Sequence, residues 1–185
     1  MKNILLRVLA PLCAVCAIVG LDQVTKYLTI QYLSDGNSIV IIKNVLELVF
    51  VKNEGMAWGM LQQKQWLFII LTPIAVAGLI YLFYRAPFEK RFLPFRITEI
   101  MLMGGAIGNL IDRCFRCEGF GTGYVVDMIY FKLIDFPVFN VADSFITIAF
   151  VLLIALVIFY YKDEDFDRIL GKKSKKREFI DNEDN

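Results

Sequence analysis

Histidine is absent from the 185-residue sequence, and this absence removes several common hydrolase chemistries. Ser-His-Asp and Cys-His nucleophile systems need an imidazole as their general base. The His-Glu-x-x-His zinc site of metallopeptidases needs two histidines. The glycine-rich strings that bind nucleotide phosphates, Gly-x-x-x-x-Gly-Lys-Ser/Thr and Gly-x-Gly-x-x-Gly, are missing as well. An acid–base catalyst in this chain is therefore best sought among its carboxyl groups.

An excess of charge of either sign is also lacking. The 20 basic and 19 acidic residues give a net charge of +1, which gives a nucleic-acid role no support. Hydrophobic residues instead make up 57% of the chain, and the mean hydropathy is +0.56. This composition is too apolar for an ordinary soluble domain and indicates a membrane protein. At this length, one compact domain is the expected organisation.

Four stretches are long and apolar enough to cross a bilayer, which takes roughly 17–25 residues. The third is the least apolar, because it carries Arg96, Glu99 and Asn109. We therefore expect an all-α membrane protein with four transmembrane helices, in a membrane-embedded domain that covers residues 1–161. The expected spans cover about residues 4–21, 66–84, 95–111 and 144–161.

Basic residues predict how these spans are oriented. They flank the start of the first span, at Lys2 and Arg7, and they gather in the connection 85–96 and in the tail at 172–177. With four spans, these regions lie on one side of the membrane, which the positive-inside rule makes cytoplasmic. Both termini are then cytoplasmic, and the connections 22–65 and 112–143 face outward. In a bacterium, this describes a multi-pass protein of the cytoplasmic (inner) membrane.

A cleavable signal peptide is the alternative interpretation of residues 1–21. The apolar run is long for such a peptide. Its removal would leave three spans and would put the arginine-rich connection and the basic tail on opposite sides of the membrane. A membrane span is therefore the favoured interpretation.

The first outer connection is more than a loop. Residues 39–42 and 46–51 are rich in Val, Ile, Leu and Phe and flank a Lys-Asn break, which predicts two short strands. Asn53-Glu54-Gly55 then forms a turn in which Gly55 is free to adopt positive φ. We expect a small extracytoplasmic β-sheet that caps the bundle, with an edge that can pair with a peptide backbone.

The segment 162–185 is highly charged and poor in large apolar residues, so we expect a mobile cytoplasmic tail. Its basic cluster is able to contact anionic membrane phospholipids. Enforcing the topology is the simpler explanation of the same residues.

Asp127 and Asp143 are the most unusually placed acids in the sequence. Asp127 follows an apolar run, Asp143 opens the fourth span, and both fall on the outer side of the membrane. A carboxylate near hydrocarbon is costly, so it marks a functional site. The helix dipole favours the ionised form of Asp143, whereas desolvation favours the protonated form of Asp127. Two such acids can share a proton and activate water, as in aspartic proteases; which one holds the proton stays open.

Polar residues accompany this pair in the sequence. Asn109 and Arg113 lie four residues apart and share a helix face, where they can bind a substrate carbonyl or a carboxylate. Asn140 lies three residues before Asp143 and adds to the polar shell. Asp112 points elsewhere on the same helix and is expected to pair with a base in a structural role.

Two further pairs have simpler explanations. Gly104 and Gly108 form a small-xxx-small face that lets another helix approach closely. Asp22 and Lys26 close the first span at i and i+4, and we expect them to form a structural ion pair at the surface.

Two Cys-x-x-Cys strings, at residues 13–16 and 114–117, contain the ligands of a four-thiolate zinc site. The first string lies inside an apolar span and the second in an outer connection, so they lie at different depths and a zinc site is disfavoured. In this topology, Cys114 and Cys117 face an oxidising compartment, where they can form a local disulfide.

Five strings between residues 22 and 143 occur in an order that is typical of one known family. They are Asp22-Gln-Val-Thr-Lys26, Asn53-Glu-Gly55-Met-Ala57-Trp58, Gly104-Gly105-Ala-Ile-Gly108-Asn109-Leu-Ile-Asp112-Arg113, Val125-Val126-Asp127 and Phe139-Asn140-Val-Ala142-Asp143. Any one of them is weak, but the five in order are specific. The chain resembles lipoprotein signal peptidase, also called signal peptidase II, a family of bacterial membrane aspartic endopeptidases.

This resemblance implies an endopeptidase that removes the signal peptide from diacylglyceryl-modified prolipoproteins by cleaving just before the lipidated cysteine. Asp127 and Asp143 would be the catalytic pair, at the outer face of the membrane. No metal and no organic cofactor are implied, and globomycin-type cyclic peptides would be inhibitors. The substrate-binding or supporting residues that it implies are Asn53, Gly55, Asn109, Asp112, Arg113, Asn140, Asp22 and Lys26.

Two other classes of function remain as alternatives. An ion-coupled transporter would use the acids as a proton relay, but it predicts acids deep within the spans rather than at their edges. A non-catalytic membrane scaffold held together through Gly104 and Gly108 would leave Asn109, Arg113 and the two acids unexplained.

Overall fold

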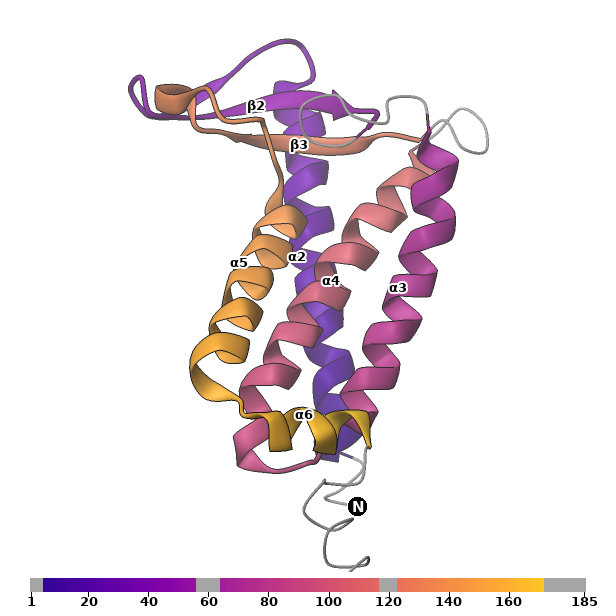
Figure 1. Cartoon of the computed structure of the whole chain (residues 1–185). Helices are drawn as coiled ribbons and strands as arrows, with labels where there is room; N and C mark the ends of the chain where they lie inside the picture. Colours follow the sequence, from indigo (N-terminus) through magenta and orange to yellow (C-terminus); the bar gives the residue numbers. More distant parts are fainter. Residues whose placement is uncertain (1–4, 56–63, 117–122, 172–185) are drawn as a thin grey trace, which may run out of the picture.

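The computed structural model describes residues 5–55, 64–116 and 123–171. Within these ranges, four long helices form a bundle, and a small sheet lies across one end of it (Figure 1). The helices are α2 (Ala10–Leu33), α3 (Gln65–Arg85), α4 (Leu93–Phe115) and α5 (Val141–Ala155). The sheet consists of β1 (Ile39–Ile42), β2 (Leu46–Asn53) and β3 (Val125–Tyr130), and a short helix, α6 (Asp163–Leu170), crosses the opposite end of the bundle.

Three helical segments of the described chain are long and apolar enough to cross a membrane by length and composition. They cover Arg7–Leu33, Gln65–Arg85 and Val141–Tyr160. The outer faces of these segments expose large apolar side chains, for example Leu12, Ile74 and Phe150, which suits contact with hydrocarbon. The prediction of a mostly helical membrane protein with a small sheet is therefore confirmed.

The remaining long helix, α4, is the most polar of the four because it carries the charged residues that the sequence placed in the third span. It packs against α2, α3 and α5, so these residues point into the bundle. Arg96, Glu99, Asn109 and Asp112 are all buried there. That α4 is a fourth transmembrane span stays a prediction, and its low hydropathy has a physical reason in this central position.

The glycines of α4 allow its neighbours to approach closely, as predicted for Gly104 and Gly108. A Cβ atom on Gly104 would lie 2.7 Å from Ile18 Cγ2, and one on Gly108 would lie 2.6 Å from Asp22 Oδ2, both on α2. A Cβ atom on Gly105 would lie 2.6 Å from the Ala142 carbonyl oxygen at the start of α5. Any larger residue would push α2 or α5 away.

The first helix is longer than the sequence indicated. α2 continues to Leu33, whereas the predicted span ended at residue 21, so Asp22 and Lys26 lie within the helix. Both side chains are 0% exposed. The predicted ion pair forms, with Lys26 Nζ 2.8 Å from Asp22 Oδ2, but its predicted surface location is wrong, because this part of α2 is covered by α4, α5 and the sheet.

The sheet is antiparallel in the order β1-β2-β3. Both strands predicted in the first connection are present, but β3 comes from the second connection and was not predicted. Most of β3 is buried on both faces, so it lacks the alternation that marks a half-buried strand. Asn53 pairs with Val125, which brings the end of β2 beside the start of β3.

The chain bends at Glu54 and Gly55, just after β2, where a turn was predicted. The Gly55 backbone N–H donates a hydrogen bond of 2.9 Å to Asn53 Oδ1, so an asparagine side chain shapes this turn.

The start of the charged tail is ordered, contrary to the prediction of a mobile segment. Ile169 of α6 packs in a buried apolar cluster with Ala86, Phe92, Phe95 and Tyr161. An ion pair of 2.6 Å between Arg91 and Asp165 also holds α6 to the start of α4. The predicted lipid-contacting basic cluster at 172–177 lies outside the described residues.

Candidate active site

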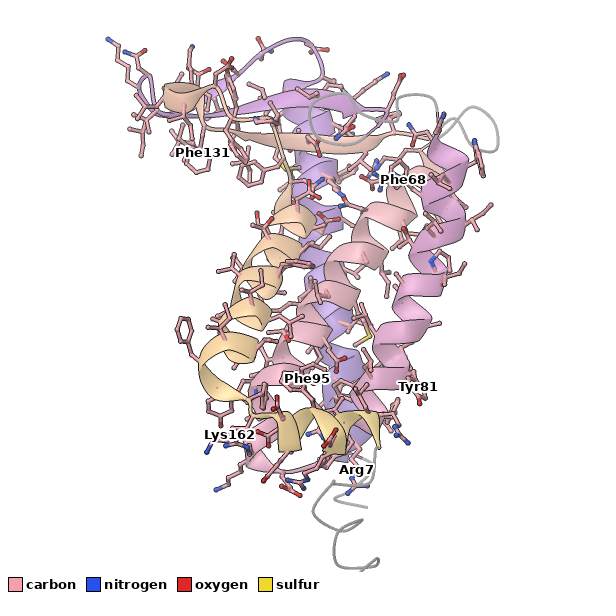
Figure 2. All side chains as sticks on the ribbon, viewed as in Figure 1. Arg7, Phe68, Tyr81, Phe95, Phe131 and Lys162 are labelled. Atoms are coloured by element: carbon pink, nitrogen blue, oxygen red, sulfur yellow. The ribbon has the colours of Figure 1, made fainter. Side chains whose placement is uncertain are left out.

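The two aspartates lie at the sheet end of the bundle, on different elements. Asp127 is the third residue of β3, and its side chain is almost fully buried. Asp143 is the third residue of α5. Figure 2 shows Phe68 of α3 near the same end, whereas Arg7 and Lys162 lie at the opposite end. The site is therefore built where a strand crosses the ends of the helices.

Asn140 links the two aspartates directly. It is the N-cap of α5, and its Oδ1 atom accepts a hydrogen bond of 2.9 Å from the Asp143 N–H. The Asp143 carboxylate in turn accepts from the Asn140 N–H, which completes a capping box. The Asn140 Nδ2 atom donates to Asp127 Oδ1 at 2.6 Å. The string Phe-Asn-Val-Ala-Asp thus starts a helix and binds the other aspartate with the same side chain.

Two more asparagines complete the hydrogen bonding of the pair. Asn53, at the end of β2, donates from Nδ2 to Asp127 Oδ2 at 2.8 Å. Asn109, near the end of α4, donates from Nδ2 to Asp143 Oδ1 at 2.7 Å. Each of the four carboxylate oxygens therefore accepts one hydrogen bond from an amide, and these amides come from β2, α4 and the start of α5.

The electrostatic environment distinguishes the two acids. Burial, and after it the nearby charge of Asp143, raise the pKa of Asp127 to about 7. Hydrogen bonds from Asn53 and Asn140 oppose this rise, as does the charge of Lys26, but they do not overcome it. The desolvation that the sequence indicated for Asp127 therefore favours the protonated form of this side chain.

Arg113 lies beside the pair, at the end of α4. Its guanidinium group donates weakly to the Asn109 and Gly55 carbonyl oxygens, at 3.4 and 3.5 Å. It also lies 4.7 Å from the centre of the Phe68 ring. Its buried Nε atom has no hydrogen-bond partner among the described residues. Arg113 thus keeps a donor free next to the two aspartates.

Lys26 is the centre of a second buried cluster behind the aspartates. Its Nζ atom lies 2.8 Å from Asp22 Oδ2 and 3.0 Å from Asp112 Oδ2, and all three side chains are 0% exposed. Nζ also donates to Asn109 Oδ1 at 2.9 Å, and Asn109 binds Asp143. The structure therefore brings every predicted site residue into one continuous network.

Sequence reasoning missed several participants in this network. Arg116 pairs with Asp112 at 3.0 Å, and its i+4 spacing was a usable signal. Gln23 donates to Asp112 Oδ1 and to the Gly108 carbonyl oxygen, at 2.9 and 3.1 Å. Phe68 gave no signal, because it is one apolar residue within a long apolar run.

No group of three or more potential ligand side chains within residues 5–55, 64–116 and 123–171 could hold a metal ion. Cys13 and Cys16 are exposed on α2, within an apolar membrane-crossing segment. Cys117 lies outside the described residues, so the disulfide with Cys114 stays a prediction. The groups that the structure brings together at this site are carboxyl, amide and guanidinium groups.

Comparisons with known proteins point to one family. Residues 14–159 match the model of the family described as signal peptidase (SPase) II. The chain is 43% identical over 150 residues to the lipoprotein signal peptidase of Geobacillus thermodenitrificans (strain NG80-2), which covers 80% of this chain and 89% of that protein. It is 45% identical over 146 residues to the lipoprotein signal peptidase of Caldanaerobacter subterraneus subsp. tengcongensis, covering 78% of this chain and 93% of that protein.

Solved structures give the same result for the fold. A bacterial membrane enzyme determined by the in meso method at 2.3 Å resolution superposes with a TM-score of 0.69 and 33% sequence identity, over 84% of this chain and 93% of that chain. A second such structure, at 1.9 Å resolution, gives the same TM-score and identity over 83% of this chain and 96% of that chain. The likeness thus extends over most of the chain in both comparisons.

Proposed function

The chain belongs to the signal peptidase II family, and we propose that it is an aspartic endopeptidase in which Asp127 and Asp143 activate the attacking water. Membership of this family makes it a bacterial membrane peptidase that removes signal peptides from prolipoproteins. The finer proposal is that the substrate cysteine already carries diacylglycerol and that cleavage falls just before this cysteine.

The observation that carries this proposal is the pair of aspartates bridged by Asn140. Peptide hydrolysis needs an acid and a base that act on the same water. Asp127, whose pKa is raised to about 7, is suited to be the acid. Asp143 at the start of α5 is joined to Asp127 through Asn140 and would be the base.

The reaction would proceed in two steps. In the first, Asp143 accepts a proton from the water while the water oxygen bonds to the scissile carbonyl carbon, and Asp127 gives its proton to the carbonyl oxygen. In the second, the resulting gem-diol returns a hydroxyl proton to Asp127 as the C–N bond breaks. The proton held by Asp143 then passes to the leaving amine, so both aspartates regain their starting states.

Arg113 and the turn at Gly55 are proposed to hold the substrate backbone. The free Nε donor of Arg113 is buried next to the aspartates, where a substrate carbonyl oxygen would satisfy it. Phe68 keeps the guanidinium in place through a cation–π contact. The sheet across the end of the bundle would form the upper wall of this site.

We also propose the topology that the basic residues predict. Arg7, Arg85, Lys90 and Arg91 all belong to the end of the bundle opposite the sheet, which supports a cytoplasmic location for that end. The sheet and the active site would then face outward, α4 would be the fourth span and residues 162–185 would form a cytoplasmic tail. Phospholipids would surround the apolar outer faces, and globomycin-type cyclic peptides would occupy the substrate site.

Replacement of either aspartate tests the proposed mechanism. Asp127→Asn and Asp143→Asn each remove one partner in proton transfer, so we expect the rate of cleavage of a diacylglyceryl precursor to fall by at least about 1,000-fold. Cleavage is measured by gel shift on purified protein in detergent, after membrane insertion of each variant has been verified.

Asp135→Asn is the matched control for this experiment. Asp135 is an exposed acid at the sheet end, and asparagine tolerates its positive φ of 47°. We expect this variant to cleave at the wild-type rate. Wild-type cleavage by Asp127→Asn or by Asp143→Asn would overturn the aspartic mechanism but would leave the family assignment intact.

A further inference from the structure

The two acids behind the active site contact the backbone beside each proposed catalytic acid. Asp22 Oδ1 accepts a hydrogen bond of 2.9 Å from the N–H of Ala142, the residue before Asp143. Asp112 Oδ2 accepts one of 3.1 Å from the N–H of Val126, the residue before Asp127. Both hydrogen bonds are buried, and each fixes the backbone at one step from a reacting carboxyl group.

Lys26 joins these two acids to each other. Its ammonium group pairs with Asp22 and with Asp112, and it also donates to Asn109, which binds the Asp143 carboxylate. Ala142 belongs to a helix of the bundle, whereas Val126 belongs to the sheet. One buried cation therefore connects the two elements that carry the aspartates. Asp22 can take part because residue 108 is a glycine, since a larger side chain there would clash with the Asp22 carboxylate.

We propose that Lys26 is a positioning residue that sets the separation of Asp127 and Asp143 and, by its charge, keeps a single proton on the pair. This inference rests on the aspartic mechanism proposed above. A buried ion cluster adds little net stability compared with well-packed apolar residues, so stability alone does not explain three fully buried charges at this place. A reaction that needs both carboxyl groups on one water does explain them, because a displacement of about 1 Å can cost about 100-fold in rate.

The charges around Lys26 support the second half of this proposal. Carboxyl groups from α2, α4, β3 and α5 face three cations from α2, from α4 and from the residue that follows α4. The carboxyl groups are those of Asp22, Asp112, Asp127 and Asp143, and the cations are Lys26, Arg113 and Arg116. With every group ionised, the cluster has one negative charge too many. A single shared proton makes it neutral, which is the state that the dyad needs.

Two substitutions with opposite effects on this charge balance test the proposal. Lys26→Met removes a cation, so the cluster should retain its proton to higher pH, and the alkaline limb of the kcat profile should move to higher pH. Asp22→Asn removes an acid, so the limb should move to lower pH. In Asp22→Asn the amide oxygen can still accept from Ala142, whereas the amide nitrogen breaks the contact with Lys26.

The positioning half predicts a particular loss of rate. In Lys26→Met, kcat should fall by about 100-fold while KM changes by less than about 3-fold, because substrate contacts are unaffected. Hydrogen exchange at the Val126 and Ala142 amides should become faster, because the carboxylates that accept their hydrogen bonds lose the ion pair with Lys26. Lys26→Arg keeps the charge, so it should restore the wild-type position of the pH limb.

The control is Asp165→Asn, at the opposite end of the bundle. Asp165 is a largely buried acid, and this substitution breaks its ion pair with Arg91. It should leave the pH limb and the exchange at Val126 and Ala142 unchanged. The proposal is overturned if the limb moves in neither Lys26→Met nor Asp22→Asn, or if exchange at the two amides is no faster than in Asp165→Asn. If Lys26→Met fails to accumulate in the membrane, the direction of the shift in Asp22→Asn decides.

Failure of the aspartic mechanism itself would be visible separately. It would appear as cleavage by Asp127→Asn or Asp143→Asn, whereas hydrogen exchange at Val126 and Ala142 reports on the Lys26 anchor without any need for activity. If exchange is faster in Lys26→Met and the aspartate variants are active, the aspartic mechanism is rejected, whereas the role of Lys26 in fixing the backbone at Val126 and Ala142 is retained.

Discussion

The two ends of the helical bundle are both held together by ion pairs, but they use charge differently. At the α6 end, Arg91 and Asp165 form two hydrogen bonds, of 2.7 and 2.6 Å, with one cation for one acid and with Arg91 38% exposed. At the sheet end, Asp22, Lys26 and Asp112 are 0% exposed, and acids outnumber cations around the proposed dyad. A matched pair with a partly exposed cation is sufficient to close this end of the bundle. A buried excess of acid is costly and therefore indicates a site of reaction.

The same difference gives the two ends opposite responses to pH. The pKa of Asp127 is raised to about 7 by burial and by Asp143, so the folded protein favours the protonated form of this side chain. Its contribution to stability is present at low pH and is lost as pH rises through about 7. The pKa of Asp165 is lowered below its usual 3.8, chiefly by the hydrogen bond from Arg91. That contribution is present above pH 3.8 and is lost as pH falls below this value.

Among the variants that compare the two ends, one that crowds the sheet end should have the largest effect on activity and stability. In Gly108→Ala, the added Cβ atom would lie 2.6 Å from Asp22 Oδ2, so α2 and α4 must move apart within the Lys26 cluster. We expect kcat to fall by about 100-fold and stability to fall by about 1–3 kcal/mol. Cleavage assays and thermal unfolding in the same detergent measure the two effects.

Gly78→Ala is the matched control for crowding, because nothing lies within 4 Å of a Cβ atom at Gly78 in α3. Alanine is a better helix former than glycine, so this variant should keep its activity and should gain about 0.5–1 kcal/mol in stability. Equal loss of activity in both variants would mean that glycine flexibility, rather than close packing around Asp22, matters for catalysis.

Removing one donor from the dyad should have an intermediate effect. In Asn53→Ala, Asp127 loses a hydrogen bond of 2.8 Å that favours its ionised form. The acid should therefore hold its proton to higher pH, and the alkaline limb of the kcat profile should move up by about one pH unit, the equivalent of one hydrogen bond to a charged group. The neighbouring variant Lys52→Gln should not move the limb, because the Lys52 ammonium group lies over the Tyr124 ring. A downward shift in Asn53→Ala would contradict Asp127 as the acid.

The sequence predicted the parts of the site that local pattern controls. Asp143 lies in the first turn of α5, and the segments predicted as strands, 39–42 and 46–51, lie in β1 and β2, because both features depend on neighbouring residues. The glycine face of α4 also packs as its spacing indicated. Helices and their close contacts follow from the spacing of apolar and small residues along the chain, and a single sequence is enough to show that spacing.

Long-range burial was beyond the reach of the sequence. Asp22 and Lys26 look like a surface pair on one helix, and only the packing of α4 and β3 against them makes them the centre of the site. Similarly, β3 is recognised as a strand only when β2 lies beside it. The helix α6 was not predicted, because its sequence is mostly charged. Its few apolar residues indicate an ordered helix only once they are seen to pack against Phe92 and Tyr161.

Breaking the ion pair of the α6 end should have the smallest effect. Asp165→Asn removes the pairing with Arg91 but leaves Ile169 packed in the apolar cluster, so we expect the unfolding midpoint at pH 7 to fall by only about 2–4 °C. The difference from wild type should shrink as pH falls below 3.8, where wild-type Asp165 also loses its charge, and thermal unfolding between pH 3 and 8 would measure this change. Cleavage per folded molecule should stay at the wild-type level. A fall in kcat comparable with that of Gly108→Ala would show that the two ends are coupled through α4. It would then no longer be true that the ion pair at one end only holds the bundle, while the buried excess of acid at the other end serves the reaction.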